Sequence, residues 1–266
     1  MEFQVKLIDR NNKRFFANLL FLLLIGVFLV FASGCKKDED KEDNQNITFN
    51  SFSDPRDGNI YKTIKIGNQF WMAENLRYLP DVSHPIVGIN SLPFHYVYFY
   101  FGKETYNGYS TDIVDAKANE HYSNYGVLYN WQAALNSCPP DWHLPTYDEW
   151  KELTHFLGGD SIAGAKLRNR ELSLWDDPLT GPDTTSSNVS NFSAIPGGRR
   201  NPDGTFGGMG MFSYFWSSED KPVGNAWDGN AWYMMLINND SIAHIHNYAG
   251  KQYGFSVRCL KNENKQ

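Results

Sequence analysis

The sequence contains few cysteines and no excess of basic residues. Its 266 residues include three cysteines, 24 lysines and arginines and 30 aspartates and glutamates, so the net charge is −6. Three scattered cysteines are too few for a disulfide-based scaffold and lack the spacing of a zinc site. Nucleic-acid binding requires clustered basic side chains that displace counterions from phosphates, and this charge balance argues against it. We therefore expect no nucleic-acid partner, no metal and no cofactor.

Aromatic residues and glycine are abundant instead. The chain has 18 Phe, 15 Tyr, 8 Trp and 22 Gly, and 41% of its residues are apolar. This composition excludes a disordered or coiled-coil protein, because it supplies enough apolar surface for a core together with many turn-forming positions. The length suits one large domain or two small ones.

A long apolar run occupies the N-terminal region. It extends from Phe15 to Phe31 and follows basic residues at positions 6, 10, 13 and 14. This layout is typical of a signal peptide, although a membrane-spanning anchor has a similar length. The run ends in Ala32-Ser33-Gly34-Cys35, which resembles the bacterial lipobox, where small residues precede a lipidated cysteine. We therefore expect residues 1–34 to be a lipoprotein signal peptide and Cys35 to carry the lipid.

A charged stretch follows Cys35. Residues 36–46 contain only Lys, Asp, Glu, Asn and Gln. With no apolar side chain to bury, they predict a solvated acidic tether over residues 35–47. The tether is either a plain spacer or, as we favour, a segment similar to the surface-export signal of Bacteroidetes lipoproteins. The expected location is the outer membrane, where the lipid makes the membrane a partner and the chain is exposed at the cell surface.

Strand signals recur along the rest of the chain. Residues 60–66 are rich in β-branched and aromatic residues, and Gly67-Asn68 leads into residues 69–73, which predicts a β-hairpin. Residues 79–124 read as irregular and tyrosine-rich. Further short strands are expected at residues 210–217, 231–237 and 254–260.

One helix has a well-marked start. Thr146 and Glu149 form a capping box, and Trp150, Leu153 and Leu157 then fall on one face of a helix. Shorter helices are expected within residues 124–136 and 160–170.

Seven segments of the chain together resemble one protein family. They are GNIYKT (58–63), IGNQFWMAENL (66–76), YGVLYNW (125–131), CPPDWHLPT (138–146), FSAIPGG (192–198), FWSS (215–218) and GFSVRC (254–259). In this order they are similar to the Fibrobacter succinogenes major paralogous domain, found in secreted and lipidated bacterial proteins. Residues 79–124 depart from the pattern and are interpreted as an insertion. The resemblance implies a domain and a compartment, but no activity.

Two shorter resemblances concern the fold. The stretch from Trp142 to Trp150 resembles part of the formylglycine-generating enzymes, and Gly254–Cys259 is similar to the last strand of C-type lectin-like domains. Both belong to loop-rich architectures in which the terminal strands pair. The expected fold is therefore α+β, a single loop-rich C-type lectin-like domain over residues 48–262, with short antiparallel strands and one or two helices.

Cys138 and Cys259 remain once Cys35 takes the lipid. An exported protein lies in oxidising surroundings, so an even pair favours a disulfide, and the two positions are those of the family's structural pair. Two buried free thiols are the alternative. A thiol-oxidase or sulfatase-modifying role would need redox-active cysteines or a copper-binding pair, and no third thiol is left for it.

Two tryptophans and one arginine are candidates for ligand binding. Trp227 and Trp232 lie among asparagines and an aspartate, and aromatic rings flanked by amides and carboxylates suit stacking on sugar rings; core packing is the alternative. Arg199 and Arg200 follow a Pro-Gly-Gly turn. One of them can brace the turn by donating to backbone carbonyls while the other meets an anionic ligand, and we name Arg200 as the ligand candidate.

Catalytic and metal sites have less support in the sequence. Asp148 and Glu149 are adjacent, whereas glycoside cleavage needs carboxyl groups on opposite sides of the bond. His244 and His246 share one face of a strand and, with His143, are candidate metal ligands, but no further ligand spacing accompanies them. We therefore name no catalytic residue and no metal ligand.

These observations predict a lipid-anchored surface protein that binds rather than cuts. The expected function is a non-catalytic binding or adhesion module for a glycan or protein ligand, with its contact face in the loops after residue 174. The alternatives are a surface enzyme acting on glycans or peptides, whose acidic pair only folding brings together, and a purely structural component of a surface assembly.

Overall fold

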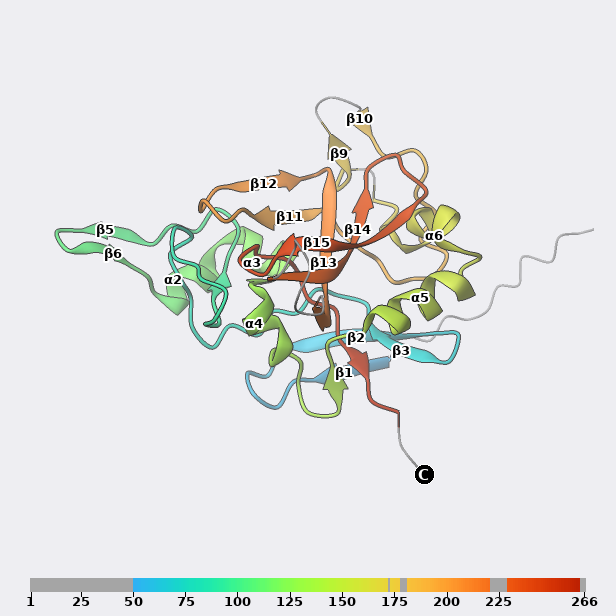
Figure 1. Ribbon diagram of the computed structural model, residues 1–266, viewed down its shortest axis with the longest axis horizontal. Helices are drawn as coiled ribbons and strands as arrows, with labels where there is room; N and C mark the ends of the chain where they lie inside the picture. The colour runs from blue at the N-terminus through green and yellow to red at the C-terminus, as the bar shows by residue number, and fades with distance from the viewer. Residues whose placement is uncertain (1–49, 172, 178–180, 221–228, 264–266) are drawn as a thin grey trace, which may run out of the picture. The chain divides into compact units, whose positions relative to one another are not determined.

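The largest sheet joins the start of the folded unit to its end (Figure 1). The computed structural model describes residues 50–171, 173–177, 181–220 and 229–263. The strands pair antiparallel in the order β1-β2-β3-β16-β8. Their bounds are β1 (Asn50–Ser53), β2 (Ile60–Ile66), β3 (Gln69–Met72), β16 (Leu260–Lys261) and β8 (Trp142–His143). The C-terminal strand thus lies inside the sheet, between two strands that come more than a hundred residues earlier in the chain.

The β2–β3 hairpin forms where the sequence predicted it. Along β2, Tyr61, Ile64 and Ile66 are buried while Lys62 and Lys65 are exposed. Because side chains alternate along a strand, Tyr61 packs in one core cluster from one face, and Ile64 and Ile66 pack in the other cluster from the opposite face. The turn between the strands contains Gly67, whose φ of 60° is one that residues with a Cβ rarely adopt.

A second, three-stranded antiparallel sheet follows the order β13-β14-β15. It consists of β13 (Phe212–Asp220), β14 (Asn230–Ile237) and β15 (Ala243–Gly250). The strands expected at residues 210–217 and 231–237 are therefore present. Four two-stranded pairs accompany the two sheets: β4 (His95–Tyr96) with β7 (Leu128–Tyr129), β5 (Lys103–Thr105) with β6 (Gly108–Ser110), β9 (Asp176–Asp177) with β10 (Gly181–Pro182), and β11 (Gly197–Arg200) with β12 (Phe206–Met209).

The continuous strand expected at residues 254–260 is wrong. Only Leu260 and Lys261 form a strand, because the preceding residues exchange backbone hydrogen bonds with several separate segments. Gly254 pairs with Arg200, Phe255 with Tyr129, and Ser256 with Tyr214. This stretch therefore connects the two-stranded pairs and both sheets through the interior.

Five helices occur within the described ranges, more than the one or two expected. They are α2 (Ile113–Ala118), α3 (Glu120–Tyr125), α4 (Trp131–Leu135), α5 (Tyr147–Phe156) and α6 (Asp160–Leu167). Two of them lie in the segment 79–124 that read as irregular, where Asp112 and Asn119 cap α2 and α3 by accepting hydrogen bonds from backbone N–H groups. Among the residues that the structure describes, no helix has the length and apolar character needed to cross a membrane.

Helix α5 confirms the capping-box prediction. The Thr146 hydroxyl accepts from the backbone N–H of Glu149, and the Glu149 carboxylate accepts from the backbone N–H of Thr146. Trp150, Leu153 and Leu157 are buried on the inner face of the helix. The start and the orientation of α5 therefore follow from local sequence.

The family-motif tryptophans divide between two core clusters instead of packing as one group. Trp71 and Trp150 stack with ring centroids 4.7 Å apart in one cluster. Trp131, Trp142 and Trp216 belong to the other cluster. Each of these five side chains is buried, as expected for residues that form the core.

Candidate binding surface

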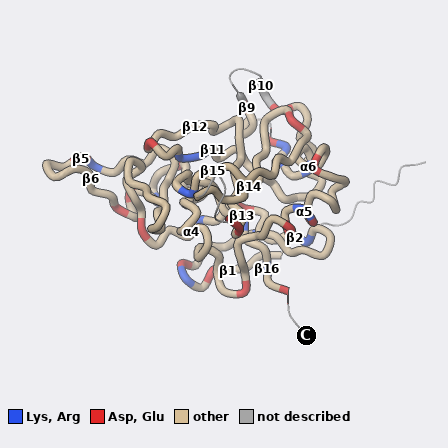
Figure 2. The backbone as a smooth tube through the Cα atoms, viewed as in Figure 1, with Lys and Arg blue, Asp and Glu red and all other residues tan. Residues whose placement is uncertain are grey.

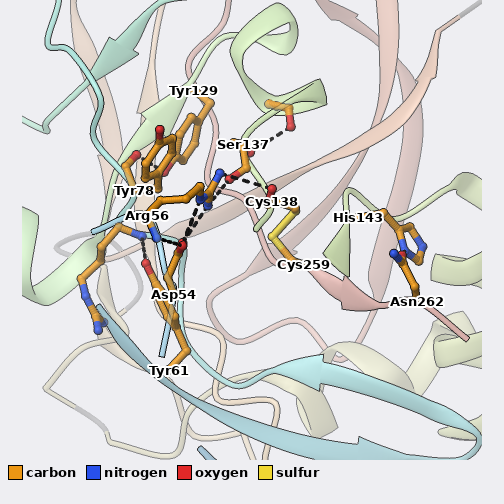
Figure 3. The surroundings of a disulfide bond; sticks show 12 residues. Asp54, Arg56, Tyr61, Tyr78, Tyr129, Ser137, Cys138, His143, Cys259 and Asn262 are labelled. Atoms are coloured by element: carbon orange, nitrogen blue, oxygen red, sulfur yellow. Dashed lines mark hydrogen bonds and ion pairs between the residues drawn. A yellow bond between two sulfur atoms is a disulfide. The ribbon is translucent and has the colours of Figure 1, made fainter. Parts of the chain in front are cut away.

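A disulfide joins Cys138, which follows α4, to Cys259, which precedes β16 (Figure 3). Next to it, the guanidinium of Arg56 donates to the carbonyl oxygen of Ser137 at 2.8 Å and forms an ion pair with the buried carboxylate of Asp54. Segments from the start, the middle and the end of the folded unit therefore lie together at the disulfide. The expected pairing of the two cysteines is present.

Arg200 has the bracing role and does not reach a ligand surface. Its side chain is fully buried, and its guanidinium donates to the carbonyl oxygens of Pro85, Val87 and Gln252. The backbone of Arg200 pairs with Gly254 in the interior, which directs the side chain inward. The assignment of Arg200 to ligand binding is therefore corrected, because its donors are already used and no part of it reaches solvent.

Trp232 lies on β14, half-buried, with its ring 4.3 Å from that of Tyr147 at the start of α5. The contact is one of packing, and the ring keeps some exposure. Trp227, its proposed companion, and Cys35, the proposed lipidation site, lie outside the residues that the structure describes. The sugar-stacking role of the two tryptophans thus stays a prediction.

Another set of aromatic rings forms a continuous surface feature that the sequence analysis did not identify. The rings follow one another at centroid distances of 3.7 to 6.4 Å. We call them the aromatic row; in order they are Tyr109, His84, Phe101, Phe206, Phe99, His121 and Tyr125.

Two distant parts of the chain build the aromatic row. Five of its rings come from the segment 79–124 and Tyr125 directly follows it, whereas Phe206 begins β12. Phe206 contacts both Phe99 and Phe101, and below them it contacts the buried ring of Tyr98 at 4.9 Å. The segment 79–124 is therefore seated on the β11–β12 pair, and the two lie on the same side of the view in Figure 1.

The aromatic row belongs to the most apolar exposed part of the described chain. Phe99, Phe101 and Tyr109 are 52%, 48% and 54% exposed. Phe99 has a φ of 56°, a conformation that costs free energy for a residue with a Cβ. Of 16 exposed large apolar side chains in the described ranges, nine lie between residues 86 and 114, so this segment is where such exposure concentrates: Ile86, Val87, Ile89, Leu92, Phe99, Phe101, Tyr106, Tyr109 and Val114.

Charged residues of both signs flank this surface. Lys103 is paired with Asp115 at 2.9 Å, and Glu120 precedes His121 of the row. Over the whole described chain, basic and acidic positions are scattered without a continuous run of one sign (Figure 2). The aromatic row therefore offers apolar and aromatic contact, with flanking charges of mixed sign.

A pocket of about 820 Å³ surrounds the pair formed by His143 and Glu149. The His143 Nε2 atom lies 2.8 Å from a Glu149 carboxylate oxygen, and its Nδ1 atom lies 2.6 Å from the side-chain oxygen of Asn262. The hydrogen bond to Glu149 raises the pKa of His143 despite partial burial. Burial opposes ionisation of Glu149, but hydrogen bonds from His143 and Thr146 outweigh it and lower its pKa.

Both oxygens of the Glu149 carboxylate are engaged in hydrogen bonds within the fold. One carboxylate oxygen faces His143 and the other accepts from the backbone and hydroxyl of Thr146. A carboxylate held in this way is poorly placed to act as a general acid. The neighbouring Asp148 is exposed and forms no pair with it.

The candidate metal-binding histidines do not converge. His244 and His246 share a face of β15, with ring centroids 5.7 Å apart, and His244 pairs with Asp240. His143 belongs to the other sheet. Within the described ranges no group of three or more His, Cys, Asp or Glu side chains is arranged to hold a metal ion.

A smaller pocket of about 260 Å³ opens beside the end of the aromatic row. Tyr125, the last ring of the row, lines it together with Lys62, Arg77 and the buried Arg258. The pocket is polar, in contrast to the row, and its cations come from three different parts of the chain.

The comparisons with known proteins identify one family pattern. The family model described as the Fibrobacter succinogenes major domain (Fib_succ_major) matches residues 64–261. No curated protein and no solved structure matches the chain.

Proposed function

The chain belongs to the Fibrobacter succinogenes major domain family, and within that family we propose that it is a non-catalytic module that binds a protein partner through the aromatic row. The observation that carries this proposal is the concentration of exposed apolar side chains on one segment. Soluble domains rarely leave contiguous apolar surface in water unless it contacts a partner. The strained backbone of Phe99 adds support, because it holds a large ring outward at a free-energy cost.

The mixture of side chains favours a protein over a glycan. Sugar rings stack on flat aromatic faces, whereas Ile86, Val87, Ile89 and Leu92 in the same segment offer branched aliphatic surface. Aliphatic and aromatic groups together are typical of the centre of a protein–protein interface. The partner is therefore expected to present an uncharged apolar face of its own.

The test places a photo-crosslinking amino acid at position 101 in the full chain, expressed in its own cells. A matched probe at position 156 serves as control, since Phe156 is also an exposed phenylalanine but lies on α5. We expect one protein to crosslink at position 101 and not at position 156. Its binding to the purified module should then fall about tenfold or more in a Phe99→Ser/Phe101→Ser variant, while Phe156→Ser leaves binding unchanged.

Three outcomes would overturn the proposal. Equal crosslinking at both positions would mean that exposure alone explains the contact. Specific glycan binding that depends on Phe99 and Phe101, without a protein partner, would mean that the aromatic row binds a glycan instead of a protein. Turnover of a glycan or peptide by the purified module would contradict its non-catalytic character.

We also propose that the module is a lipoprotein anchored in the outer membrane and facing outward. The support is the sequence before residue 48: a basic start, an apolar run, small residues before Cys35 and an acidic tether. Metabolic labelling with an alkyne fatty acid should mark the chain and should fail in Cys35→Ser. Protease treatment of intact cells should remove the module, and resistance would contradict outward display.

The mixed α+β architecture is further proposed to be C-type lectin-like. The sheet that holds both β1 and β16 supports this, because it brings the two ends of the folded unit into one sheet, although β16 pairs with β3 and β8 and not with β1. An experimental structure whose connectivity differs from that fold would contradict the relation.

A further inference from the structure

The small pocket beside Tyr125 contains an unusual balance of charge, and we refer to it as the cationic pocket. It is bounded by β2, by the residues that follow β3, by the end of α3 and by Arg258. Its charged lining residues are Lys62, Arg77, Arg258 and one acid, Glu74. The pocket therefore has a local charge of +2 in a chain whose net charge is −6.

Arg258 supplies a buried charge at the base of the pocket. Its guanidinium is fully buried and donates to the Asn75 side-chain oxygen at 2.9 Å and to backbone carbonyls of Met72, Phe192 and Ser193. All of these acceptors are neutral, and no described carboxylate forms an ion pair with it. Burial lowers the pKa of Arg258 to about 9, which still leaves the group charged at neutral pH.

The single acid of the pocket does not neutralise this charge. The Glu74 carboxylate accepts from the backbone N–H of Lys62 at 2.7 Å and lies 3.6 Å from the Arg77 guanidinium. The ammonium group of Lys62 has no ion pair in the described part of the chain, and the residue is exposed. Lys62 and Arg258 therefore make the site positive. Arg77 also lines the pocket, where its guanidinium donates to the Ile60 carbonyl oxygen at 2.8 Å and keeps further N–H groups for a ligand.

We propose that the cationic pocket binds a small hydroxylated organic anion, of the size of one sugar acid. A volume of about 260 Å³ lies just below the range of roughly 300–1,000 Å³ that drug-sized ligands occupy, so the pocket suits a single small ring. Arginine and lysine at the rim match a carboxylate group. Amides of Asn124 and Asn169 line the remaining wall and can bond hydroxyl groups.

Arg258 acts through its field and not by contact, since no part of it reaches solvent. In a site partly screened from water its charge raises the affinity for an anion that Lys62 and Arg77 touch directly. This inference does not depend on the proposed protein partner, although the cationic pocket adjoins the aromatic row at Tyr125.

The test measures binding of glucuronate, glucose and sulfate to the full chain by NMR titration at low ionic strength. We expect glucuronate to bind about tenfold or more tightly than glucose, because glucose lacks the charge. The Arg77→Gln variant should weaken glucuronate binding about tenfold. Lys62→Gln should weaken it about two- to fivefold, as expected for one exposed charge.

Lys65→Gln is the matched control. Lys65 is also exposed on β2, but its ammonium group lies over the Phe70 ring and the residue does not line the pocket. It removes the same charge and should leave binding unchanged. Phe99→Ser/Phe101→Ser should also leave it unchanged, so failure here is distinguishable from failure of the proposed protein binding.

Three results would overturn the inference. The first is equal binding of glucuronate and glucose, which would exclude charge recognition. The second is sulfate binding as tight as that of glucuronate, which would exclude an organic ligand. The third is an equal effect of Lys62→Gln and Lys65→Gln, which would reduce the binding to general charge attraction. The Lys62→Gln variant decides the matter even if Arg77→Gln fails to fold, because the Lys62 side chain bonds no other residue in the described part of the chain.

Discussion

The disulfide between Cys138 and Cys259 should contribute more to stability than any other single feature that one substitution can remove. It closes a loop of 121 positions. In the chain-entropy model, cross-linking a loop of that length lowers the entropy of the unfolded chain by about 16 cal/mol/K, or about 5 kcal/mol at 25 °C. Measured contributions are commonly smaller, so we expect a loss of about 3–5 kcal/mol when the bond is absent.

The assay is equilibrium unfolding in urea of the chain that begins after Cys35, oxidised and fully reduced. This comparison keeps both sulfur atoms and changes only the cross-link. In a parallel thermal melt, the melting temperature should fall by about 6–20 °C on reduction, given about 2–4 °C per kcal/mol for a domain of this size. A Cys138→Ala/Cys259→Ala variant should lose at least as much, since it also removes buried atoms. Oxidised and reduced forms that unfold at the same midpoint would refute the reasoning and would mean that the pairing of β16 holds the chain end without help.

Two further predictions concern local features. The raised pKa of His143 means that its contribution to the unfolding free energy is present below its ordinary pKa of 6.5 and is lost as the pH rises through its folded pKa. The lowered pKa of Glu149 gives the opposite dependence: its contribution is present above its ordinary pKa of 4.5 and is lost in stronger acid. His143→Gln should therefore cost about 0.5–1 kcal/mol near pH 5.5 and less at pH 8, measured by urea unfolding, and a cost independent of pH would contradict the charged pair. Gly126 has a φ of 81°, and an added Cβ would lie 2.8 Å from the Leu76 carbonyl oxygen, so Gly126→Ala should lower the unfolding free energy by about 1–3 kcal/mol. Gly197→Ala, whose Cβ would meet no atom closer than 3.6 Å, is the control, and equal losses in the two variants would refute the steric argument.

Local signals predicted the local elements well. The β2–β3 hairpin needs only a run of β-branched and aromatic residues and a glycine turn, and the start of α5 needs only Thr146 and Glu149, so a few neighbouring residues specify each. Helices α2 and α3 were missed because each has six residues, which is too short for an apolar period to stand out from the tyrosine-rich background.

The aromatic row could not be predicted, because its rings are contributed by segments about a hundred positions apart. Phe99 and Phe101 precede the helices of the segment 79–124, and Phe206 begins β12. A clustering of aromatic residues in that segment was visible in the sequence, but not which of them stay exposed. The burial of Arg200 could not be predicted either. The turn that precedes it was visible in the sequence, but its burial depends on backbone pairing with the distant Gly254.

The sequence by itself determined the family, the mixed α+β character, the capping of α5 and the cysteines available for pairing, because each depends on residue identity or short spacing. Tertiary structure alone decided which charges and rings meet. Lys62, Arg77 and Arg258 share a pocket only because the end of the chain passes back beside β3, and the aromatic row exists only because β12 lies under the segment 79–124. Contacts between distant residues carry no local signature, so a single sequence does not reveal them.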